Sequence, residues 1–183
     1  MNPEIQTHID DLLSNDRERQ SQGFMALMAA TEQPVDWSYS LWDHMVADLT
    51  HKDNRQRAHA AQLLANLAKS DPEGRMLNDF DALLHVTRDD RFVTARHALQ
   101  AIWKVGLAGD AQKRQLIDGL EQRFAECGTE KNSTLIRYDI LQGLRHLYDA
   151  APDDSIRETA LALIETETDA RYRKKYATVW RAK

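Results

Sequence analysis

The sequence predicts an all-α chain in which about five helical hairpins stack into a solenoid. One pattern of residues recurs at intervals of 36 to 42 residues, the spacing of a two-helix unit. Apolar residues follow a helical period both within and between the copies of this pattern. Only 7 glycines and 4 prolines occur in 183 residues, too few for the frequent turns of a β-sandwich or barrel.

The strongest copies of the pattern begin at Arg57, Ala95 and Arg137 and align over eleven residues without gaps. Weaker copies begin at Gln20 and Arg173. In the strong copies the fourth, eighth and eleventh positions are apolar, and such an i, i+4, i+7 stripe marks the buried face of a helix. The stripes are Ala60, Leu64 and Leu67; Ala98, Ile102 and Val105; and Ile140, Leu144 and Leu147.

Four residues before each copy lies a position at which a helix is predicted to begin. Asp16, Asp53, Ser133 and Asp169 occupy it in four copies, and Arg91 in the fifth. Aspartate and serine side chains accept hydrogen bonds from the free amide groups of a first helical turn. We therefore predict that the second helix of each hairpin starts at these positions.

The first helix of each hairpin is predicted between these copies, after turns that contain proline or glycine. Neither helix of a hairpin can bury its apolar stripe alone, so the hairpins must stack. The first-helix stripes are Ile5, Ile9 and Leu12; Leu41, Met45 and Leu49; Met76, Phe80 and Leu83; Leu116, Leu120 and Phe124; and Ile156, Ala160 and Leu163. The approximate repeats of this single domain (1–183) are 3–33, 34–70, 71–108, 109–150 and 151–183.

The pattern Arg-x-x-Ala-(Ala/Leu)-x-x-Leu, preceded by a turn with Asp and an apolar helix, resembles the HEAT-repeat superfamily. The resemblance covers essentially the whole chain and is strongest over residues 36–150. The chain is similar to small, stand-alone bacterial HEAT-repeat proteins, many of which have no assigned activity. This resemblance implies a right-handed α–α superhelix of the HEAT/armadillo-like type, in which the second helices line a concave surface.

Polar residues of the second helices are therefore the candidates for binding a partner. Gln62, Gln100 and Gln142 share one column and would form a ladder that bonds between repeats or to a partner's backbone. Cationic and aromatic side chains nearby would suit an acidic or aromatic group, unless Trp103 packs into the core instead. The expected partner-binding residues are Arg96, Gln100, Trp103, Lys104, Tyr138, Gln142, Arg145 and His146.

The last predicted helix is basic, with aromatic residues interleaved. This segment could contact RNA or an acidic partner through Arg171, Arg173, Lys174 and Lys175. The alternative is a solvated helix face, with aromatic rings behind it that cover the end of the core.

No catalytic or metal-binding motif is evident. None of the 7 histidines precedes Glu or belongs to His-x-x-x-His, and neither a Gly-x-Ser-x-Gly elbow nor a glycine-rich phosphate loop occurs. We expect no enzyme activity, metal or cofactor. A lyase or chaperone-like action on a tetrapyrrole protein rests only on fold analogy with phycobilisome lyase-type HEAT proteins.

An enzymatic alternative follows from alkylpurine DNA glycosylases, which are built from HEAT-like repeats. Trp103, Tyr138 and Asp139 would take the roles of the aromatic and acidic residues, with basic contacts to phosphates from Arg96, Lys104 and Arg145. A pI near 5.8 and an acidic first repeat count against binding to duplex DNA.

Charge and composition complete the expectation. The net charge is −5, with an acidic segment at 1–50 and a basic one at 167–183, a polarity that permits head-to-tail contact. The single cysteine, Cys127, is expected to be buried, and neither a secretory signal nor a membrane span is apparent. The sequence thus favours a cytoplasmic, non-enzymatic module that binds an acidic or extended segment of another protein. Nucleic acid remains the alternative partner, and the oligomeric state is left open.

Overall fold

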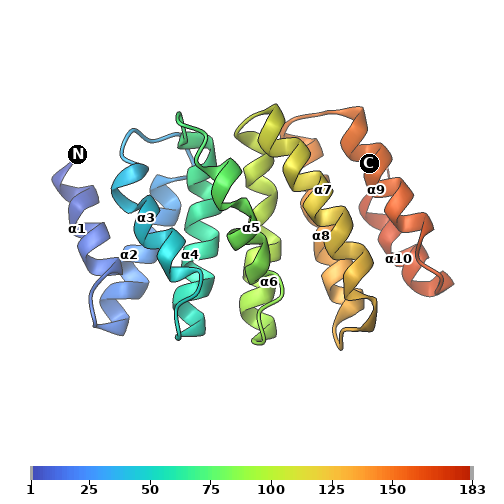
Figure 1. Cartoon of the computed structure of the whole chain (residues 1–183), viewed down its shortest axis with the longest axis horizontal. Coiled ribbons are helices and arrows are strands. Elements are labelled where there is room, and N and C mark those ends of the chain that lie inside the picture. Colours follow the sequence, from blue (N-terminus) through green and yellow to red (C-terminus); the bar gives the residue numbers. More distant parts are fainter. Residues whose placement is uncertain (1, 182–183) are drawn as a thin grey trace.

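The computed structural model describes residues 2–181, which form ten α-helices and three short 3-10 helices without any strand (Figure 1). The prediction of an all-α chain is confirmed. The α-helices form five consecutive pairs: α1 (Pro3–Leu12) and α2 (Arg17–Ala30), α3 (Tyr39–Asp48) and α4 (Asn54–Leu67), α5 (Met76–Val86) and α6 (Phe92–Ala101), α7 (Asp110–Glu126) and α8 (Ser133–Ala150), and α9 (Asp154–Glu165) and α10 (Ala170–Val179). The 3-10 helices are η1 (Ala68–Ser70), η2 (Ile102–Leu107) and η3 (Cys127–Thr129).

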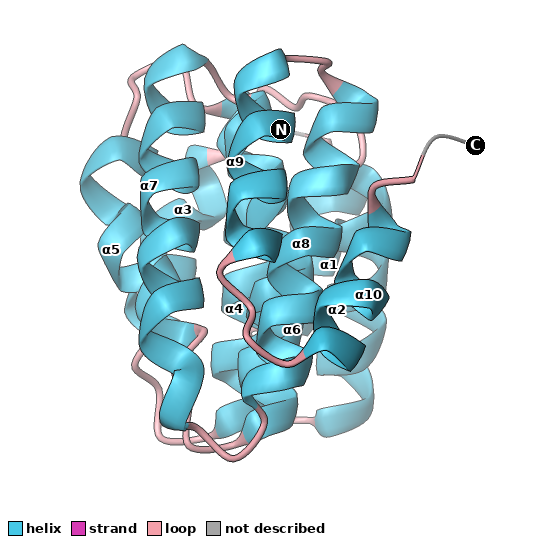
Figure 2. Cartoon of the chain, turned by 90° about the vertical axis from the view of Figure 1, so that its right-hand side faces the viewer, coloured by secondary structure: helices cyan, strands magenta, loops and turns pink. Residues whose placement is uncertain are grey.

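The five pairs lie in a row, in chain order, and the helices form two layers. Within each pair the two helices contact each other, and each second helix contacts the second helix of the next pair. The first helices from α3 to α9 contact one another in the same order. Figure 2, which looks along the row, shows α3, α5 and α7 on one side and α4, α6 and α8 beside them. We call α1, α3, α5, α7 and α9 the first-helix layer, and α2, α4, α6, α8 and α10 the second-helix layer.

The core lies between the two layers, as the apolar stripes predict. Every stripe residue is buried except Ile5, which is half-buried and packs against the others. Each buried leucine, isoleucine or phenylalanine contributes roughly 1.5–3 kcal/mol relative to an exposed side chain. Cys127, at the end of α7, is buried and free as expected, and burial raises the pKa of its thiol.

The predicted helix starts agree with the structure in four of the five second helices. Asp16, Asp53 and Asp169 each precede the helix and accept a hydrogen bond from its first turn. Arg91 precedes α6 without a side-chain cap. The cap at Ser133 is wrong: its amide already donates to the carbonyl of Glu130 (3.1 Å), and the helix begins at Ser133 itself.

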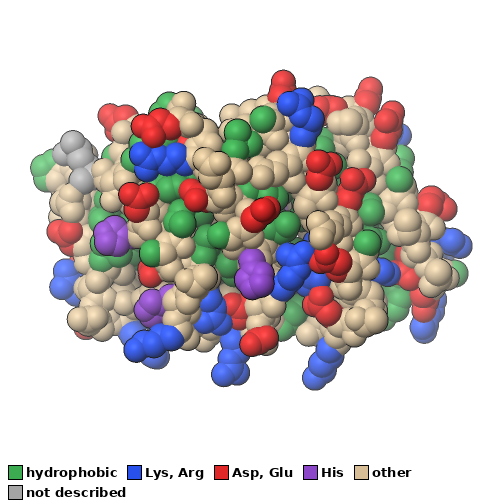
Figure 3. Space-filling view, viewed as in Figure 1, with side chains coloured by type: hydrophobic (Ala, Val, Ile, Leu, Met, Phe, Trp, Pro, Cys, Tyr) green, Lys and Arg blue, Asp and Glu red, His purple; other side chains and the backbone are tan. Residues whose placement is uncertain are grey.

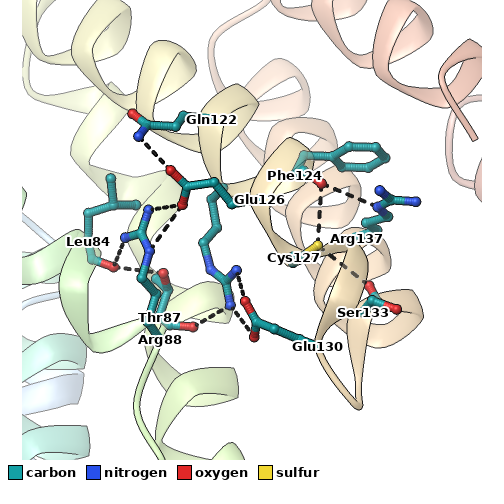
Figure 4. A network of polar contacts seen from close by, with 11 residues as sticks. Leu84, Thr87, Arg88, Gln122, Phe124, Glu126, Cys127, Glu130, Ser133 and Arg137 are labelled. Atoms are coloured by element: carbon teal, nitrogen blue, oxygen red, sulfur yellow. Dashed lines mark hydrogen bonds and ion pairs between the residues drawn. The ribbon is translucent and has the colours of Figure 1, made fainter.

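Arginine side chains join consecutive pairs along the edge where the two helices of a pair are connected. Arg123 of α7 is 1% exposed and donates to Glu130 (2.5 and 2.9 Å) and to the carbonyl of Thr87 (3.1 Å). Arg88 donates to Glu126 of α7 at 2.6 Å (Figure 4). Because Thr87 and Arg88 follow α5, these bonds fix the third pair against the fourth.

Candidate functional site

The two layers differ sharply in charge, and this asymmetry locates the candidate site. The five first helices contain fourteen acidic and four basic residues. Figure 3 looks onto this layer and shows acidic side chains spread along it. The five second helices contain three acidic residues, Glu18, Asp139 and Asp149, against eleven basic ones: Arg17, Arg19, Arg55, Arg57, Arg96, Arg137, Arg145, Arg171, Arg173, Lys174 and Lys175.

Some of this basic charge is neutralised at the edge of the layer. Arg57 pairs with Asp89, and Arg137 pairs with Glu167 at 2.8 Å, both acids lying in turns. Lys174 and Lys175 of α10 are exposed. Arg19, Arg96, Arg145 and Arg171 are also paired with carboxylates. Within residues 2–181 the second helices still contain five cations without an ion pair, from which we expect a positive potential that attracts acidic groups: Arg17, Arg55, Arg173, Lys174 and Lys175.

A hollow of about 340 Å³ between α6 and α8 gathers five of the eight residues that the sequence proposes for partner binding. We call it the α6–α8 hollow. Its lining residues are Arg96, Gln100, Tyr138, Asp139, Gln142, Gly143 and His146.

An ion pair fixes the cationic group of this hollow. Arg96 donates from Nε and Nη2 to the two carboxylate oxygens of Asp139, at 2.7 and 3.0 Å. Asp139 is only 4% exposed, whereas the Arg96 side chain remains 38% exposed. Hydrogen bonding to Asp139 raises the pKa of Arg96 above its ordinary value. The guanidinium is thus held rigidly, and within residues 2–181 its Nη1 nitrogen makes no hydrogen bond.

The other side of the hollow is formed by α8 and reached from α10. The Nζ atom of Lys175 lies 5.3 Å from the ring centroid of Tyr138, a cation–π contact. Gln142 Nε2 and His146 Nε2 are 3.4 Å apart on the adjoining turn of α8. The basic tail and the expected partner-binding residues therefore meet at one place.

Trp103 and Lys104 lie outside this hollow, contrary to what the eleven-residue pattern implies. Helix α6 ends at Ala101, and the chain continues as the 3-10 helix η2, which contains both residues. Lys104 donates to Asn66 Oδ1 at 2.5 Å, and burial lowers the pKa of its ammonium group. Trp103 packs against the core, with its ring 5.6 Å from that of His146. The alternative in which Trp103 belongs to the core describes this ring better.

Arg145 is also absent from the lining of the α6–α8 hollow. It donates to Asp149 at 2.8 Å, and its guanidinium lies 5.6 Å from the ring centroid of Trp180. It lines a separate hollow of about 340 Å³ between α8 and α10, the α8–α10 hollow. The lining residues are Gln142, Arg145, His146, Asp149, Thr178, Val179 and Arg181.

The glutamines do not form a ladder. Gln62 donates to the carbonyl of Ala58 in its own helix (3.0 Å), and Gln142 contacts His146. Gln100 is exposed, and within the described chain no hydrogen bond joins one of these glutamines to another. Their amides remain directed to local groups or solvent, so a bond to a partner's backbone stays a prediction.

Comparison with protein-family models, with curated proteins and with solved structures finds no match to this chain.

The sequence leaves two interpretations of the basic tail, a binding surface and a solvated helix face with aromatic rings behind it. Arg171 bonds to Asp169, while Arg173, Lys174 and Lys175 are exposed. On the inner side of α10, Tyr176 donates to the carbonyl of Thr134 (3.1 Å). The buried Trp180 donates to that of Leu141 (3.3 Å). The aromatic rings therefore cover the end of the core, and the cations form the outer face of the same helix.

A third hollow, of about 320 Å³, lies between α4 and α6 and was not anticipated from the sequence. In this α4–α6 hollow the ring of His59 stacks on Phe24, with centroids 3.9 Å apart, and burial lowers the pKa of His59 to about 4. Val93 is 66% exposed at its rim. Val93 lies before the first residue of the eleven-residue pattern, so the aligned positions do not include it and the sequence analysis did not propose it as a binding residue. The lining residues are Phe24, Asn54, Arg55, Ala58, His59, Gln62, Val93, Thr94 and His97.

Within residues 2–181 no cluster of three or more His, Cys, Asp or Glu side chains is placed to hold an ion. None of the helices described here is both long and apolar enough to cross a membrane. The second-helix layer therefore contains fixed cations and hydrogen-bond donors, and beside them the α4–α6 hollow, which is more apolar than the other two.

Proposed function

We propose that this chain is a HEAT-type solenoid that acts without catalysis as a cytoplasmic protein-interaction module. Its repeats, at 3–33, 34–70, 71–108, 109–150 and 151–183, build a right-handed α–α superhelix. The second-helix layer is the inner surface and binds an acidic, extended segment of another protein.

The observation that supports this proposal is that the second-helix layer has both an excess of positive charge and a row of three neighbouring hollows. A positive surface accelerates encounter with an acidic partner and disfavours basic ones. The free, buried Cys127 fits a compartment in which thiols stay reduced.

Nucleic acid is the second candidate partner, because the same basic layer and tail would attract phosphates. Glycosylase-type chemistry is not supported by the geometry. It would need a carboxylate that faces an extruded base, whereas Asp139 is 4% exposed and accepts two hydrogen bonds from Arg96. The nucleic-acid candidate is therefore one of binding alone.

The test is affinity capture from a lysate of the source cell, with and without nuclease, read by mass spectrometry. The test variant is Lys174→Glu/Lys175→Glu, since both side chains are exposed on α10. The matched control, Arg114→Glu/Arg157→Glu, makes the same change in net charge at exposed positions of the first-helix layer.

A protein partner that survives nuclease, is lost with the test variant and is kept by the control supports the proposal. Recovery of nucleic acid alone would move the second candidate to first place. Turnover of a defined substrate by the purified protein would contradict the non-enzymatic assignment.

A further inference from the structure

Three hollows follow one another across the second-helix layer, between α4 and α6, α6 and α8, and α8 and α10. Helix α6 forms a wall of the first two. Val93 and His97 of α6 line the α4–α6 hollow, and Arg96 and Gln100 line the α6–α8 hollow. A chain that crosses α6 therefore meets both hollows in succession.

The α4–α6 hollow suits an apolar side chain. Phe24 and His59 form a stacked pair, and His59 is neutral near pH 7 because burial lowers its pKa to about 4. Val93 exposes two thirds of its surface at the rim, an amount that invites a contact with another apolar group. The cation that lines the hollow, Arg55, is held at its edge by hydrogen bonds to Ser21 (2.5 Å) and to the carbonyl of Arg17 (3.1 Å).

The α6–α8 hollow suits a carboxylate. Asp139 uses only Nε and Nη2 of Arg96, so the opposite edge of the guanidinium remains a donor in fixed orientation. Gln100 and Gln142 add amide donors, and Lys175 adds a cation above Tyr138. Charge-assisted hydrogen bonds of this kind are the stronger class, and a preorganised donor loses little entropy on binding.

We propose that the partner segment is an extended peptide with one apolar and one acidic side chain about three residues apart. The apolar side chain occupies the α4–α6 hollow and the carboxylate occupies the α6–α8 hollow. Packed helices lie roughly 8–10 Å apart. In an extended segment of polyproline II type, with three residues per turn and a rise of about 3.1 Å per residue, side chains at i and i+3 share one face and lie about 9 Å apart. This inference rests on the proposed function and specifies its ligand.

The experiment uses synthetic nine-residue Gly/Ser peptides, acetylated and amidated, each carrying one Leu and one Glu separated by one to five positions, in both orders. Binding of each peptide to the full chain is measured by isothermal titration calorimetry. The i, i+3 spacing in one order should bind about tenfold more tightly than the i, i+1 peptide, since a lost charge-assisted bond costs at least this factor. Replacing Glu by Gln, or Leu by Ser, should cost a similar factor.

Two protein variants assign each side chain to its hollow. Val93→Glu should abolish the preference for the Leu peptide over the Ser peptide. Gln100→Glu should abolish the preference for the Glu peptide over the Gln peptide. Both positions are exposed and tolerate substitution. Leu161→Glu, at a side chain 42% exposed on α9, is the control and should change neither preference.

The outcomes separate this inference from the function on which it rests. Equal affinity at all spacings, or preferences that persist in the two variants, would overturn the inference, while capture of a protein partner by the same layer would leave the function intact. Binding of a single-stranded oligonucleotide, with none of any peptide, would overturn both.

Discussion

At the scale of single side chains, the ion pair of Arg96 and Asp139 is the polar contact in the lining of the α6–α8 hollow that can be tested most directly. Asp139 is 4% exposed, so Arg96→Met would leave a carboxylate without a partner in the interior. We expect this variant to lose about 2 kcal/mol of the free energy of unfolding, measured by urea denaturation, which is less than for a fully buried pair because the Arg96 side chain is 38% exposed.

The double variant Arg96→Met/Asp139→Leu is the control for this prediction. It removes both charges and should recover most of the loss, because an apolar pair can replace a buried ion pair at little cost. A loss below about 1 kcal/mol in the single variant would mean that water reaches Asp139 and that the ion pair contributes little.

His59 predicts a specific dependence of stability on pH. Burial lowers its pKa from 6.5 to about 4, with Arg55 and His97 adding to the shift and Asp53 opposing it. Between these pH values the unfolded chain binds the proton that the folded chain refuses, so stability is full above pH 6.5 and is lost as the pH falls toward 4. The expected contribution is up to about 3 kcal/mol.

The measurement is the free energy of unfolding in urea at several pH values from 7.5 to 4. His59→Gln should flatten the profile below pH 6.5, whereas His97→Gln, at an exposed position, should retain the slope of the parent chain. Identical profiles for all three proteins would show that His59 has the same pKa in the folded and the unfolded chain.

Residue-level features of the site were partly predictable from the sequence. Its columns place Arg96, Tyr138 and Gln142 on neighbouring second helices, and all three line one hollow. The same columns treat Asp139 as an exposed polar residue, yet it is buried against Arg96. Arg96 is the second residue of its copy of the pattern and Asp139 is the third residue of the next copy. They meet because α6 and α8 are displaced relative to each other along their axes. The sequence pattern of a single helix contains no information about this displacement.

At the scale of helices, the sequence predicts which segments are helical better than it predicts the residue at which a helix ends. The stripe through Ala98, Ile102 and Val105 is compatible with a helix that continues to 105, but α6 ends at Ala101 and becomes 3-10. Three residues per turn instead of 3.6 rotates the side chains that follow. This change explains why Lys104 points to Asn66 and leaves the columns in which the pattern places it.

Helix caps provide a test at this scale. Asp16 accepts hydrogen bonds from the amides of Glu18 and Arg19, both at 2.9 Å. Asp16→Ala should lower the free energy of unfolding by about 1 kcal/mol, whereas Asp16→Asn, which keeps an acceptor, should lower it by less. Ser133→Ala should change stability by less than about 0.5 kcal/mol, because Ser133 does not cap α8. Equal losses from Asp16→Ala and Ser133→Ala in urea denaturation would contradict this account.

A close approach between α1 and α2 is tested at Gly23. A Cβ atom on this residue would lie 2.5 Å from the backbone nitrogen of Leu12 and 2.6 Å from the carbonyl oxygen of His8. Because backbone atoms cannot move aside as a side chain can, Gly23→Ala should push α1 from α2 at a cost of about 1–3 kcal/mol.

Hydrogen exchange should report this change as faster exchange in residues 3–12, with little effect beyond α4. The control is Gly128→Ala, where the new Cβ would meet only the end of the Arg137 side chain at 3.3 Å. Unchanged exchange in α1 of the Gly23 variant would show that the two helices can separate without loss of structure.

At the scale of the whole molecule, the dominant electrostatic feature is the charge difference between the layers. The chain has a net charge of −5 and a pI near 5.8, values that count against an anionic partner. Those values average an acidic first-helix layer with a basic second-helix layer. The polarity noted between the ends of the chain, 1–50 and 167–183, is a smaller part of this arrangement. Counting charges helix by helix along the predicted hairpins would have revealed it, because the acidic and basic helices alternate.

This separation makes the protein's behaviour on ion-exchange resins a direct test. At an ionic strength of about 0.1 M the screening length is about 10 Å, shorter than the roughly 20 Å thickness of two helical layers. A charged surface therefore senses only the layer that faces it. At pH 7 and about 0.05–0.1 M salt we expect retention on a cation exchanger as well as on an anion exchanger, despite the net charge of −5.

Lys174→Glu/Lys175→Glu should lose retention on the cation exchanger and strengthen it on the anion exchanger. Arg114→Glu/Arg157→Glu has the same net charge but should keep its retention on the cation exchanger, since Arg114 and Arg157 belong to the first helices α7 and α9. If the two variants eluted alike from both resins, net charge alone would govern the interaction. The second-helix layer would then have no privileged attraction for an acidic partner, and the physical basis of the proposed function would be lost.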